Sequence, residues 1–474
     1  MFRFAVGLIL LFFFFTSQLF AQSTYISFNQ NSYTGDSIFI LTKADFISNK
    51  TDTLYCGKVN ESGNFECKVN TGKTISVFIP LDFFRLTFYI EPGKTYKLQF
   101  PSRKKLSVAD ELNPFFEPVE IIPEIEGSDS CELNSLINCF DKEYDIFLAK
   151  KFIKTYYIAK KSFTDSAIYV IEKKFIWAQN PYFKTYMKYK ISKLKFMAYE
   201  RDNNFIIKYN FNNNSLYLNN TAYMDMFNCV FAHYFSVSAT KSWGAGILED
   251  IAKAKSPAAL KQTFKNNPAL SNDTLIDMII LKGLHDAFYD INTTEYKSFP
   301  RKQLLMTLDS MTICAKTPEL KQIAKNIQQK VNFMISSSNA PSFALLNQDS
   351  VRINLSELRG KYLYINFTDL RSYSCANELS LLKTISEKFA QNLDVVTIFC
   401  NGSVSATREF CNKNSYKWIF LTPENTKQIV KTYNVIALPS YFLIDPYGKI
   451  ILSPAPSPDA NFEHTFISIL RKRN

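Results

Sequence analysis

The sequence predicts a multidomain protein with an N-terminal all-β sandwich or barrel, a middle all-α helical domain and a C-terminal α/β domain. Its 474 residues are more than one hydrophobic core usually organises. The hydrophobic pattern changes twice, from short alternating runs to helical spacing, and then to strand-like runs that alternate with helix-like ones. These changes predict a leader at 1–22, a β domain at 23–100, a linker at 101–131, a helical domain at 132–335 and an α/β domain at 336–474.

Composition and charge narrow the class of protein. Hydrophobic residues make up 46% of the chain and aromatic residues 15%, which excludes a mostly disordered protein. The formal net charge of +12 is spread along the chain in short clusters, such as residues 103–105, without a long basic block. This pattern favours a solvated basic surface over nucleic-acid binding, so no nucleic-acid partner is expected.

Residues 1–22 are predicted to be a secretory signal peptide. Arg3 precedes an unbroken apolar run from Phe4 to Phe15, and small or polar residues follow. The run is too short to span a bilayer comfortably, so we expect cleavage near Ala21 or Gln22, with a retained N-terminal anchor as the alternative. The mature chain is therefore expected in the periplasm or cell envelope.

Export would place the nine cysteines in an oxidising compartment. Nine is odd, so at least one thiol is unpaired within the chain, and their wide spacing predicts that most are buried as small apolar residues. His233, His285 and His464 are scattered and no close cysteine pair exists, so neither a metal nor another cofactor is expected. The cysteines are Cys56, Cys67, Cys131, Cys139, Cys229, Cys314, Cys375, Cys400 and Cys411.

The β domain is predicted from short alternating runs separated by turn residues. Glu-Ser-Gly-Asn at 61–64 indicates a hairpin, and Glu-Pro-Gly-Lys at 91–94 indicates a second turn. Cys56 and Cys67 lie on opposite arms of the first hairpin and would pair if the register allows. Four prolines among few regular patterns predict the linker at 101–131.

The helical domain shows amphipathic spacing without recognisable chemistry. In the segment at 181–202, apolar and aromatic positions alternate with lysines in a way that suits a helix whose lysine stems cover apolar surface. Peripheral contact with a membrane surface is the alternative interpretation. Ser256-Pro257 and Thr317-Pro318 each indicate a helix start.

The last unit alternates strands with helices, which implies a central sheet, parallel in part, that is covered on both faces. Helices are predicted at 373–388, at 406–412, from about 422 and at the end of the chain. Strands are predicted at 362–368, 394–400, 418–421, 441–445 and 450–453.

Four stretches of this unit resemble thioredoxin-like domains of the TlpA type, which are thiol–disulfide oxidoreductases of bacteria. They are APSFALLNQDSVRINLSELRGK, ending at Gly360 and Lys361; YLYINFT; the pair Cys375 and Glu378; and ALPSYFLIDPYGKI, which contains Pro439. The resemblance covers the chain from Ala340 to its end and implies a thioredoxin-like fold. GNFECKV and FYIEPGKTYKL resemble, more loosely, the non-catalytic regions that precede such domains in some Gram-negative exported proteins.

The expected active site departs from this family. A helix N-terminus stabilises a thiolate and lowers its pKa from about 8.5 into the range of roughly 3.5 to 7.5. Here Ser372-Tyr373-Ser374-Cys375 stands where Cys-x-x-Cys is usual, so a serine replaces the attacking cysteine. Arg371 also replaces the usual aromatic residue, and Ser380 a proline. Because a hydroxyl cannot attack a disulfide, Cys375 would be a resolving sulfur without an attacker.

Two interpretations of this site remain open from the sequence. In one, Ser372 caps the helix and Cys375 packs as a small buried residue. In the other, Cys400 ends the neighbouring strand and lies near Cys375, because the carboxyl ends of parallel strands meet at one edge of a sheet. Cys411 is a second candidate partner. A disulfide needs Cα atoms within about 7 Å, which the sequence does not establish.

The resemblance also implies a substrate groove at Pro439, with Tyr373 and Ser440 beside it, and a cis peptide bond before the proline. Such a groove can persist without the nucleophile. The two main hypotheses are therefore an oxidoreductase of weak or absent activity, and a non-catalytic binding or assembly module for another cell-envelope protein or peptide. A hydrolase based on Ser372 is disfavoured because His464 is the only histidine in this domain.

Overall fold

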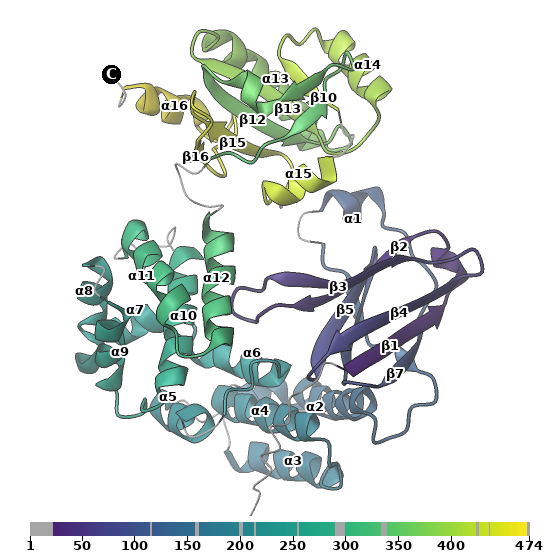
Figure 1. The fold of residues 1–474 in the computed structure, drawn as a ribbon, viewed down its shortest axis with the longest axis vertical. Helices are drawn as coiled ribbons and strands as arrows, with labels where there is room; N and C mark the ends of the chain where they lie inside the picture. Colours follow the sequence, from purple (N-terminus) through teal and green to yellow (C-terminus); the bar gives the residue numbers. More distant parts are fainter. Residues whose placement is uncertain are drawn as a thin grey trace, which may run out of the picture.

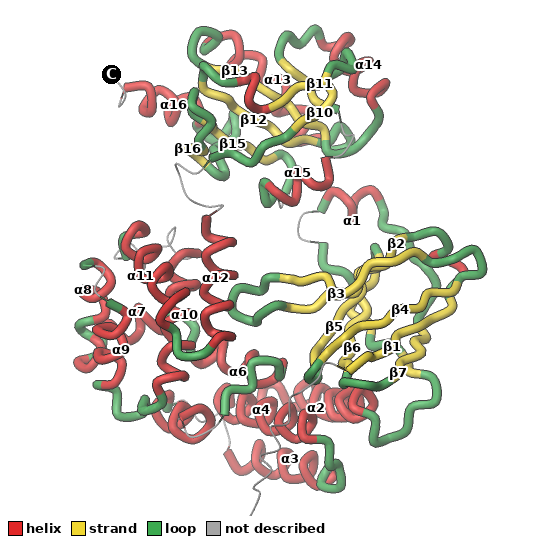
Figure 2. The backbone as a smooth tube through the Cα atoms, in the orientation of Figure 1, coloured by secondary structure: helices red, strands yellow, loops and turns green. Residues whose placement is uncertain are grey.

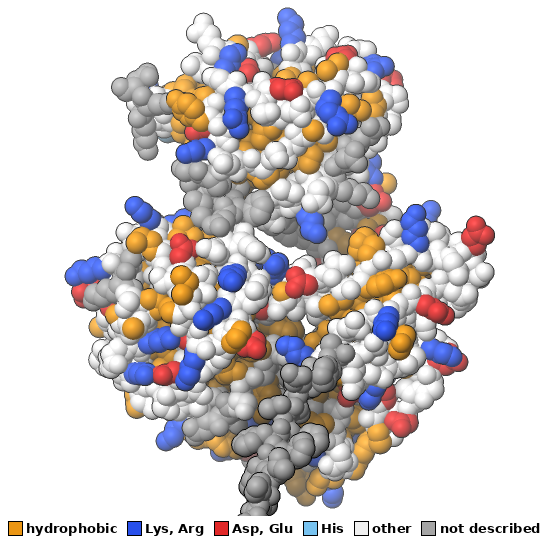
Figure 3. Space-filling view, viewed as in Figure 1, with side chains coloured by type: hydrophobic (Ala, Val, Ile, Leu, Met, Phe, Trp, Pro, Cys, Tyr) orange, Lys and Arg blue, Asp and Glu red, His pale blue; other side chains and the backbone are white. Residues whose placement is uncertain are grey.

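The computed structural model describes residues 22–113, 116–156, 161–198, 202–212, 215–253, 256–289, 299–332, 339–422, 426–435 and 437–471. The predicted signal peptide, apart from Gln22, lies outside these residues. Among the helices that the structure describes, none has the length and apolarity to cross a bilayer. Figure 1 shows a body of strands, a body of helices beside it, and a mixed body that contains the end of the chain. On the face shown in Figure 3, basic and acidic side chains are interspersed.

The N-terminal strands form two sheets around one apolar core. The strand orders are β4-β1-β7-β9 and β3-β2-β5-β6-β8. Residues alternate between buried and exposed along β4, so one face of that strand points into the core beside Ile26 and Phe88. The strands are β1 (Gln22–Asn29), β2 (Ser37–Lys43), β3 (Thr51–Lys58), β4 (Asn64–Thr71), β5 (Ile75–Leu81), β6 (Phe84–Ile90) and β7 (Thr95–Gln99).

The turn at Gly63, where φ is 75°, differs from the predicted hairpin. It connects β3 to β4, but these strands belong to different sheets, so no ladder joins them. Cys56 is exposed, Cys67 is buried, and both thiols are free, so the disulfide considered between them is not formed. The expectation that most cysteines are buried is wrong, because only Cys67, Cys375 and Cys411 are.

The stretch at 101–131, predicted to be a linker, completes both sheets. It contains α1 (Val108–Leu112), β8 (Val119–Ile121) and β9 (Glu124–Ile125). β8 pairs with β6 and β9 pairs with β7, because Ile121 and Ile125 pack against the core of the sandwich. Both are outermost strands, the positions that a proline-rich segment tolerates.

The helices from α2 to α12 enclose a second core. In α4 the aromatic face, with Phe183, Tyr186 and Tyr189, is buried in that core, while Lys184 and Lys188 are exposed. Internal packing therefore accounts for the amphipathic pattern of this segment. The helices are α2 (Leu133–Tyr156), α3 (Lys161–Lys174), α4 (Pro181–Ala198), α5 (Asn203–Ile207), α6 (Thr221–Val230), α7 (Tyr234–Ala239), α8 (Ile247–Ala252), α9 (Pro257–Lys265), α10 (Asp273–Tyr289), α11 (Arg301–Cys314) and α12 (Pro318–Asn332).

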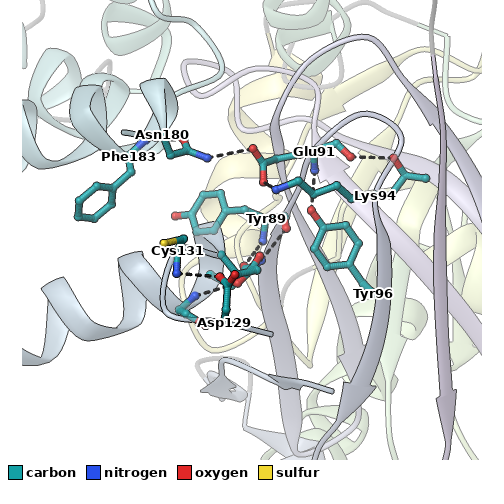
Figure 4. Close-up of polar contacts among 12 residues, drawn as sticks. Tyr89, Glu91, Lys94, Tyr96, Asp129, Cys131, Asn180 and Phe183 are labelled. Atoms are coloured by element: carbon teal, nitrogen blue, oxygen red, sulfur yellow. Dashed lines mark hydrogen bonds and ion pairs between the residues drawn. The ribbon is translucent and has the colours of Figure 1, made fainter. Parts of the chain in front are cut away.

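Polar contacts join the strands to the helices. The Tyr89 N–H donates to Asn134 Oδ1 (2.6 Å), and Asn134 Nδ2 donates back to the Tyr89 carbonyl (2.9 Å). The Glu91 carboxylate accepts from Asn180 Nδ2 (3.0 Å) and from Lys94 (Figure 4). The helical core also takes in Ile47 from the loop between β2 and β3. These two bodies therefore share buried surface.

The C-terminal domain has the predicted central sheet. The strand order is β14-β13-β12-β15-β16, with β12, β13 and β14 parallel to one another. All seven residues of β12 are buried because helices cover both faces, α13 and α16 on one and α15 on the other (Figure 2). The elements are β10 (Ala344–Leu346), β11 (Arg352–Asn354), β12 (Tyr362–Thr368), α13 (Tyr373–Lys388), β13 (Leu393–Phe399), α14 (Val404–Asn414), β14 (Ile419–Leu421), α15 (Thr426–Thr432), β15 (Ser440–Ile444), β16 (Ile450–Leu452) and α16 (Phe462–Arg471).

Candidate functional site

The candidate site lies where β12 ends and α13 begins. Ser372 occupies the N-cap position of α13, with φ −92° and ψ 123°, as the capping interpretation expects. Its side chain makes no capping hydrogen bond, however, and instead lies 3.0 Å from Ser374 Oγ. The hydroxyl of Ser372 therefore has another serine, and not a base, as its partner.

The sulfur of the motif is inaccessible. Cys375, in the first turn of α13, has no exposed surface. Tyr373, two residues earlier, is 84% exposed. The part of the motif that an incoming molecule meets is therefore a tyrosine ring and two hydroxyls.

Cys400 lies at the same edge of the sheet, as the sequence predicts. Its N–H donates to the Thr368 carbonyl at 2.9 Å, which fixes it beside the end of β12. Burial raises the pKa of the Cys400 thiol to about 12, and the negative charge of Asp369 adds to the increase. The thiols of Cys375 and Cys400 are both free. The raised pKa of Cys400 keeps its thiol protonated at neutral pH.

Cys411 is not part of this cluster. It lies in α14 and packs in the core with Phe399 and Trp418. Burial raises the pKa of its thiol to about 11, and its charged neighbour is Asp349, from the turn between β10 and β11. The structure therefore brings Cys400, and not Cys411, to the site.

Sequence reasoning missed a buried carboxylate at the rim of the site. Asp369 is 1% exposed at its side chain and accepts hydrogen bonds from Arg371 Nη2 (2.9 Å) and Asn401 Nδ2 (2.7 Å). Although burial acts to raise the pKa of Asp369, these donors lower it overall. The sequence signal that could have indicated this ion pair is an aspartate two residues before an arginine, between a predicted strand and a predicted helix.

A second carboxylate, Glu378, follows Cys375 by one turn and accepts a hydrogen bond from the Tyr441 hydroxyl. Burial raises the pKa of Glu378, although the Tyr441 hydrogen bond opposes this. Tyr441 stacks on Tyr364 with ring centroids 5.1 Å apart, which holds the hydroxyl in place. The resemblance identified Glu378 but not its hydrogen-bond partner, because the position of Tyr441 depends on the register in which β15 pairs with β12.

Pro439 and Ser440 complete the edge. The Leu438–Pro439 peptide bond is cis, as the resemblance implies. Ser440 begins β15 and pairs with Phe367 of β12. Pro439 and Ser440 therefore lie beside β12, the strand that leads to Ser372. The predicted site residues therefore come from the ends of β13 and β15, the two strands on either side of β12, and from the start of α13, at a single edge of the sheet. They are Ser372, Tyr373, Cys375, Cys400, Pro439 and Ser440.

Comparison with known proteins supports the fold of this domain. Residues 337–453 match the AhpC/TSA family model, so the chain carries a thioredoxin-family domain there. Its relatives include the thiol-disulfide oxidoreductase ResA of Bacillus subtilis (strain 168), 25% identical over 135 residues, which are 28% of this chain and 75% of that protein. ResA of Bacillus cereus (strain ATCC 10987 / NRS 248) is 26% identical over 113 residues, which are 24% of this chain and 65% of that protein. The predicted thioredoxin-like domain is confirmed.

Solved structures also resemble this domain. A putative thiol-disulfide oxidoreductase from Bacteroides vulgatus is 24% identical, with a TM-score of 0.27, and the match covers 30% of this chain and 94% of that one. A putative thiol:disulfide interchange protein DsbE from Chlorobium tepidum is 23% identical, with the same TM-score of 0.27, over 29% of this chain and 97% of that one.

Proposed function

We propose that this protein is an exported, thioredoxin-fold protein of the cell envelope with weak or absent thiol–disulfide exchange, whose site edge binds another envelope protein or peptide. The observation that carries the proposal is Ser372 at the helix start, where exchange needs a thiolate, together with the complete burial of Cys375. Relatives of this domain are named thiol-disulfide oxidoreductases. In this proposal the chain retains their fold, but only a degenerate form of the site.

Thiol–disulfide exchange requires a nucleophilic sulfur at the helix start. In exchange, a thiolate attacks one sulfur of a disulfide, a new S–S bond forms, the old one breaks and the second sulfur leaves as a thiolate. Ser372 has no sulfur to form that bond. Cys400 is the one candidate substitute at this edge, but its pKa of about 12 leaves almost no thiolate at neutral pH.

Binding is supported by what the edge exposes. Tyr373 is 84% exposed at the start of α13, and Pro439 and Ser440, at the same end of the sheet, are half-buried. Tyrosine offers a large, rigid contact area and a polar tip, which is why it is enriched at binding surfaces. Export rests on the predicted signal peptide. We further infer that the strands before residue 126 and the helices from α2 to α12 act as all-β and all-α units that support this domain.

Turnover in a disulfide-reduction assay tests the catalytic part of the proposal. Stoichiometric thiol labelling is unsuitable because Cys56, Cys131, Cys139 and Cys314 are exposed and react once each. We expect insulin reduction by the full mature chain to be at background, and Cys375→Ala to leave it unchanged. Turnover that Cys375→Ala abolishes would refute the proposal.

Restoring the sulfur provides the positive control. At a helix N-terminus a thiol pKa falls from about 8.5 to about 7.5 or lower, which raises the thiolate fraction at pH 7 roughly eightfold or more. Ser372→Cys should therefore gain turnover. Ser380→Cys, which adds an exposed thiol farther along the same helix, should not.

The binding part is tested separately by partner capture from an envelope fraction. Tyr373→Ala should lose partners that the wild-type protein retains. Tyr447→Ala is the matched control, because Tyr447 is also well exposed, at 69%, but lies in the turn between β15 and β16. Equal capture by both variants would contradict a binding role for this edge.

A further inference from the structure

Arg371 connects the candidate site to a distant part of the chain. It directly precedes Ser372, and its Nη1 forms an ion pair with the carboxylate of Glu111 in α1. Figure 1 shows α1 as the part of the strand-rich body that lies nearest to the thioredoxin-like domain. Two parts of the chain separated by 260 positions therefore meet at the rim of the site.

The guanidinium of Arg371 has one fixed and one releasable partner. Its Nη2 lies 2.9 Å from the buried Asp369 carboxylate, and its Nε lies 3.2 Å from the other oxygen of that group. The side chains of Arg371 and Glu111, by contrast, are 36% and 41% exposed. Both carboxylates raise the pKa of Arg371, so it stays charged throughout the physiological range.

The helix α1 is built to present Glu111. Ser107 Oγ accepts a hydrogen bond from the Asp110 N–H (3.1 Å), and the Asp110 carboxylate accepts from the Ser107 N–H (3.3 Å), which forms a capping box. Asp110 is thus used within the helix. Glu111, the next residue, is directed at Arg371 instead.

No hydrophobic core spans this junction in the described part of the chain. The two apolar clusters of the thioredoxin-like domain consist of residues from 340 onward, whereas the other two clusters end at residue 331. By contrast, Ile47 joins the strands and helices in one core. Domains without a large apolar interface are expected to move relative to one another.

We propose that the ion pair between Glu111 and Arg371 is a salt-sensitive latch that docks the thioredoxin-like domain on α1. When the latch opens, Arg371 presents its Nη1 to solvent beside Ser372 and Tyr373, where it binds a carboxylate of an incoming partner segment. Glu111 and the partner's acidic side chain then compete for one guanidinium edge. Only this last step rests on the proposed binding function, and the docking itself does not.

Small-angle X-ray scattering of the full mature chain at low and high salt tests the latch. Loss of a half-exposed ion pair changes an equilibrium by about 1.5- to 5-fold, so Glu111→Gln should raise the ratio of separated to docked molecules by that factor at low salt. Glu111→Arg should separate the domains further, because it places two positive charges together. High salt should shift the wild-type profile towards that of Glu111→Gln.

Glu120→Gln is the matched control. Glu120 pairs with Arg85 at 2.9 Å on the exposed surface of the strands, and both partners belong to the same sheet, so loss of this ion pair should leave the profile unchanged. Identical profiles for the wild-type protein and Glu111→Arg at low salt would overturn the proposal. The scattering measurement involves no thiol chemistry and no partner. A negative result would therefore leave the proposed function untouched, and refutation of the proposed function would leave the docking by Glu111 and Arg371 untouched.

Discussion

Asp369→Asn tests whether the buried carboxylate organises the rim of the site. The substitution keeps the shape of the side chain but removes the charge that pairs with Arg371 and accepts from Asn401. Hydrogen bonds to a charged group contribute about 1.5–3 kcal/mol each, and the partial exposure of Arg371 reduces the loss, so we expect the domain to lose about 2 kcal/mol at pH 7.

The stability that Asp369 contributes should depend on pH in one direction. The pKa of Asp369 is lowered on folding, so its contribution is present above the unfolded value of about 3.9 and disappears as the pH falls through the folded pKa. The difference between Asp369→Asn and the wild-type protein should therefore be full at pH 7 and should narrow below about pH 4.

Native-state hydrogen exchange of the β12 amides is the assay, because the chain has several cores and its global unfolding is not one transition. Asp394→Asn is the control: Asp394 pairs with Lys361 at 3.1 Å, but both side chains are more than 40% exposed. It should cost less than about 1 kcal/mol. The reasoning is refuted if the two variants lose the same stability.

Three further outcomes are expected. On alkylation of the native protein at pH 8, Cys139 and Cys314 should be modified rapidly, whereas Cys375 and Cys400 should react only after unfolding. Peptide mass spectrometry would identify the modified residues, and rapid labelling of Cys375 would contradict its burial. Burial raises the pKa of Glu378, so the local stability of the wild-type domain should fall as the pH rises from the unfolded value of about 4.3 through the folded pKa. Glu378→Gln should lack that decline in native-state hydrogen exchange of the α13 amides at pH 4 and 7. Gly283→Ala should destabilise the helical region by about 1–3 kcal/mol in thermal unfolding, because a Cβ there would lie 2.2 Å from the Phe235 ring, whereas Gly246→Ala, with its nearest atom at 3.3 Å, should have a smaller effect.

Local pattern was sufficient for much of the thioredoxin-like domain. The predicted strand at 362–368 and helix at 373–388 have these bounds in the structure. A fully buried strand and an amphipathic helix reveal themselves through the spacing of their own apolar residues, which needs no knowledge of distant contacts. The Ser-Tyr-Ser-Cys stretch at 372–375, on which the expectation of a degenerate site rests, is likewise visible in four consecutive residues.

Pairing across long sequence separations was decided by tertiary structure alone. The segment at 101–131 was predicted to be a linker because its strands are only two or three residues long, too short to show a hydrophobic period. These strands form only because β6 and β7 have unpaired edges with which they can pair. Cys56 and Cys67 likewise lie in different sheets, one exposed and the other buried, because the turn between them connects the two sheets and does not form a hairpin.

At the site itself, the sequence determined which side chains stand at the helix start, and the fold determined which groups surround them. Ser372 settles the absence of a sulfur at the helix start. The partners Asp369 with Asn401, Glu378 with Tyr441, and Arg371 with Glu111 lie 32, 63 and 260 positions apart. A carboxylate or guanidinium carries no local signal of its partner, because side-chain pairing depends on where separate elements pack.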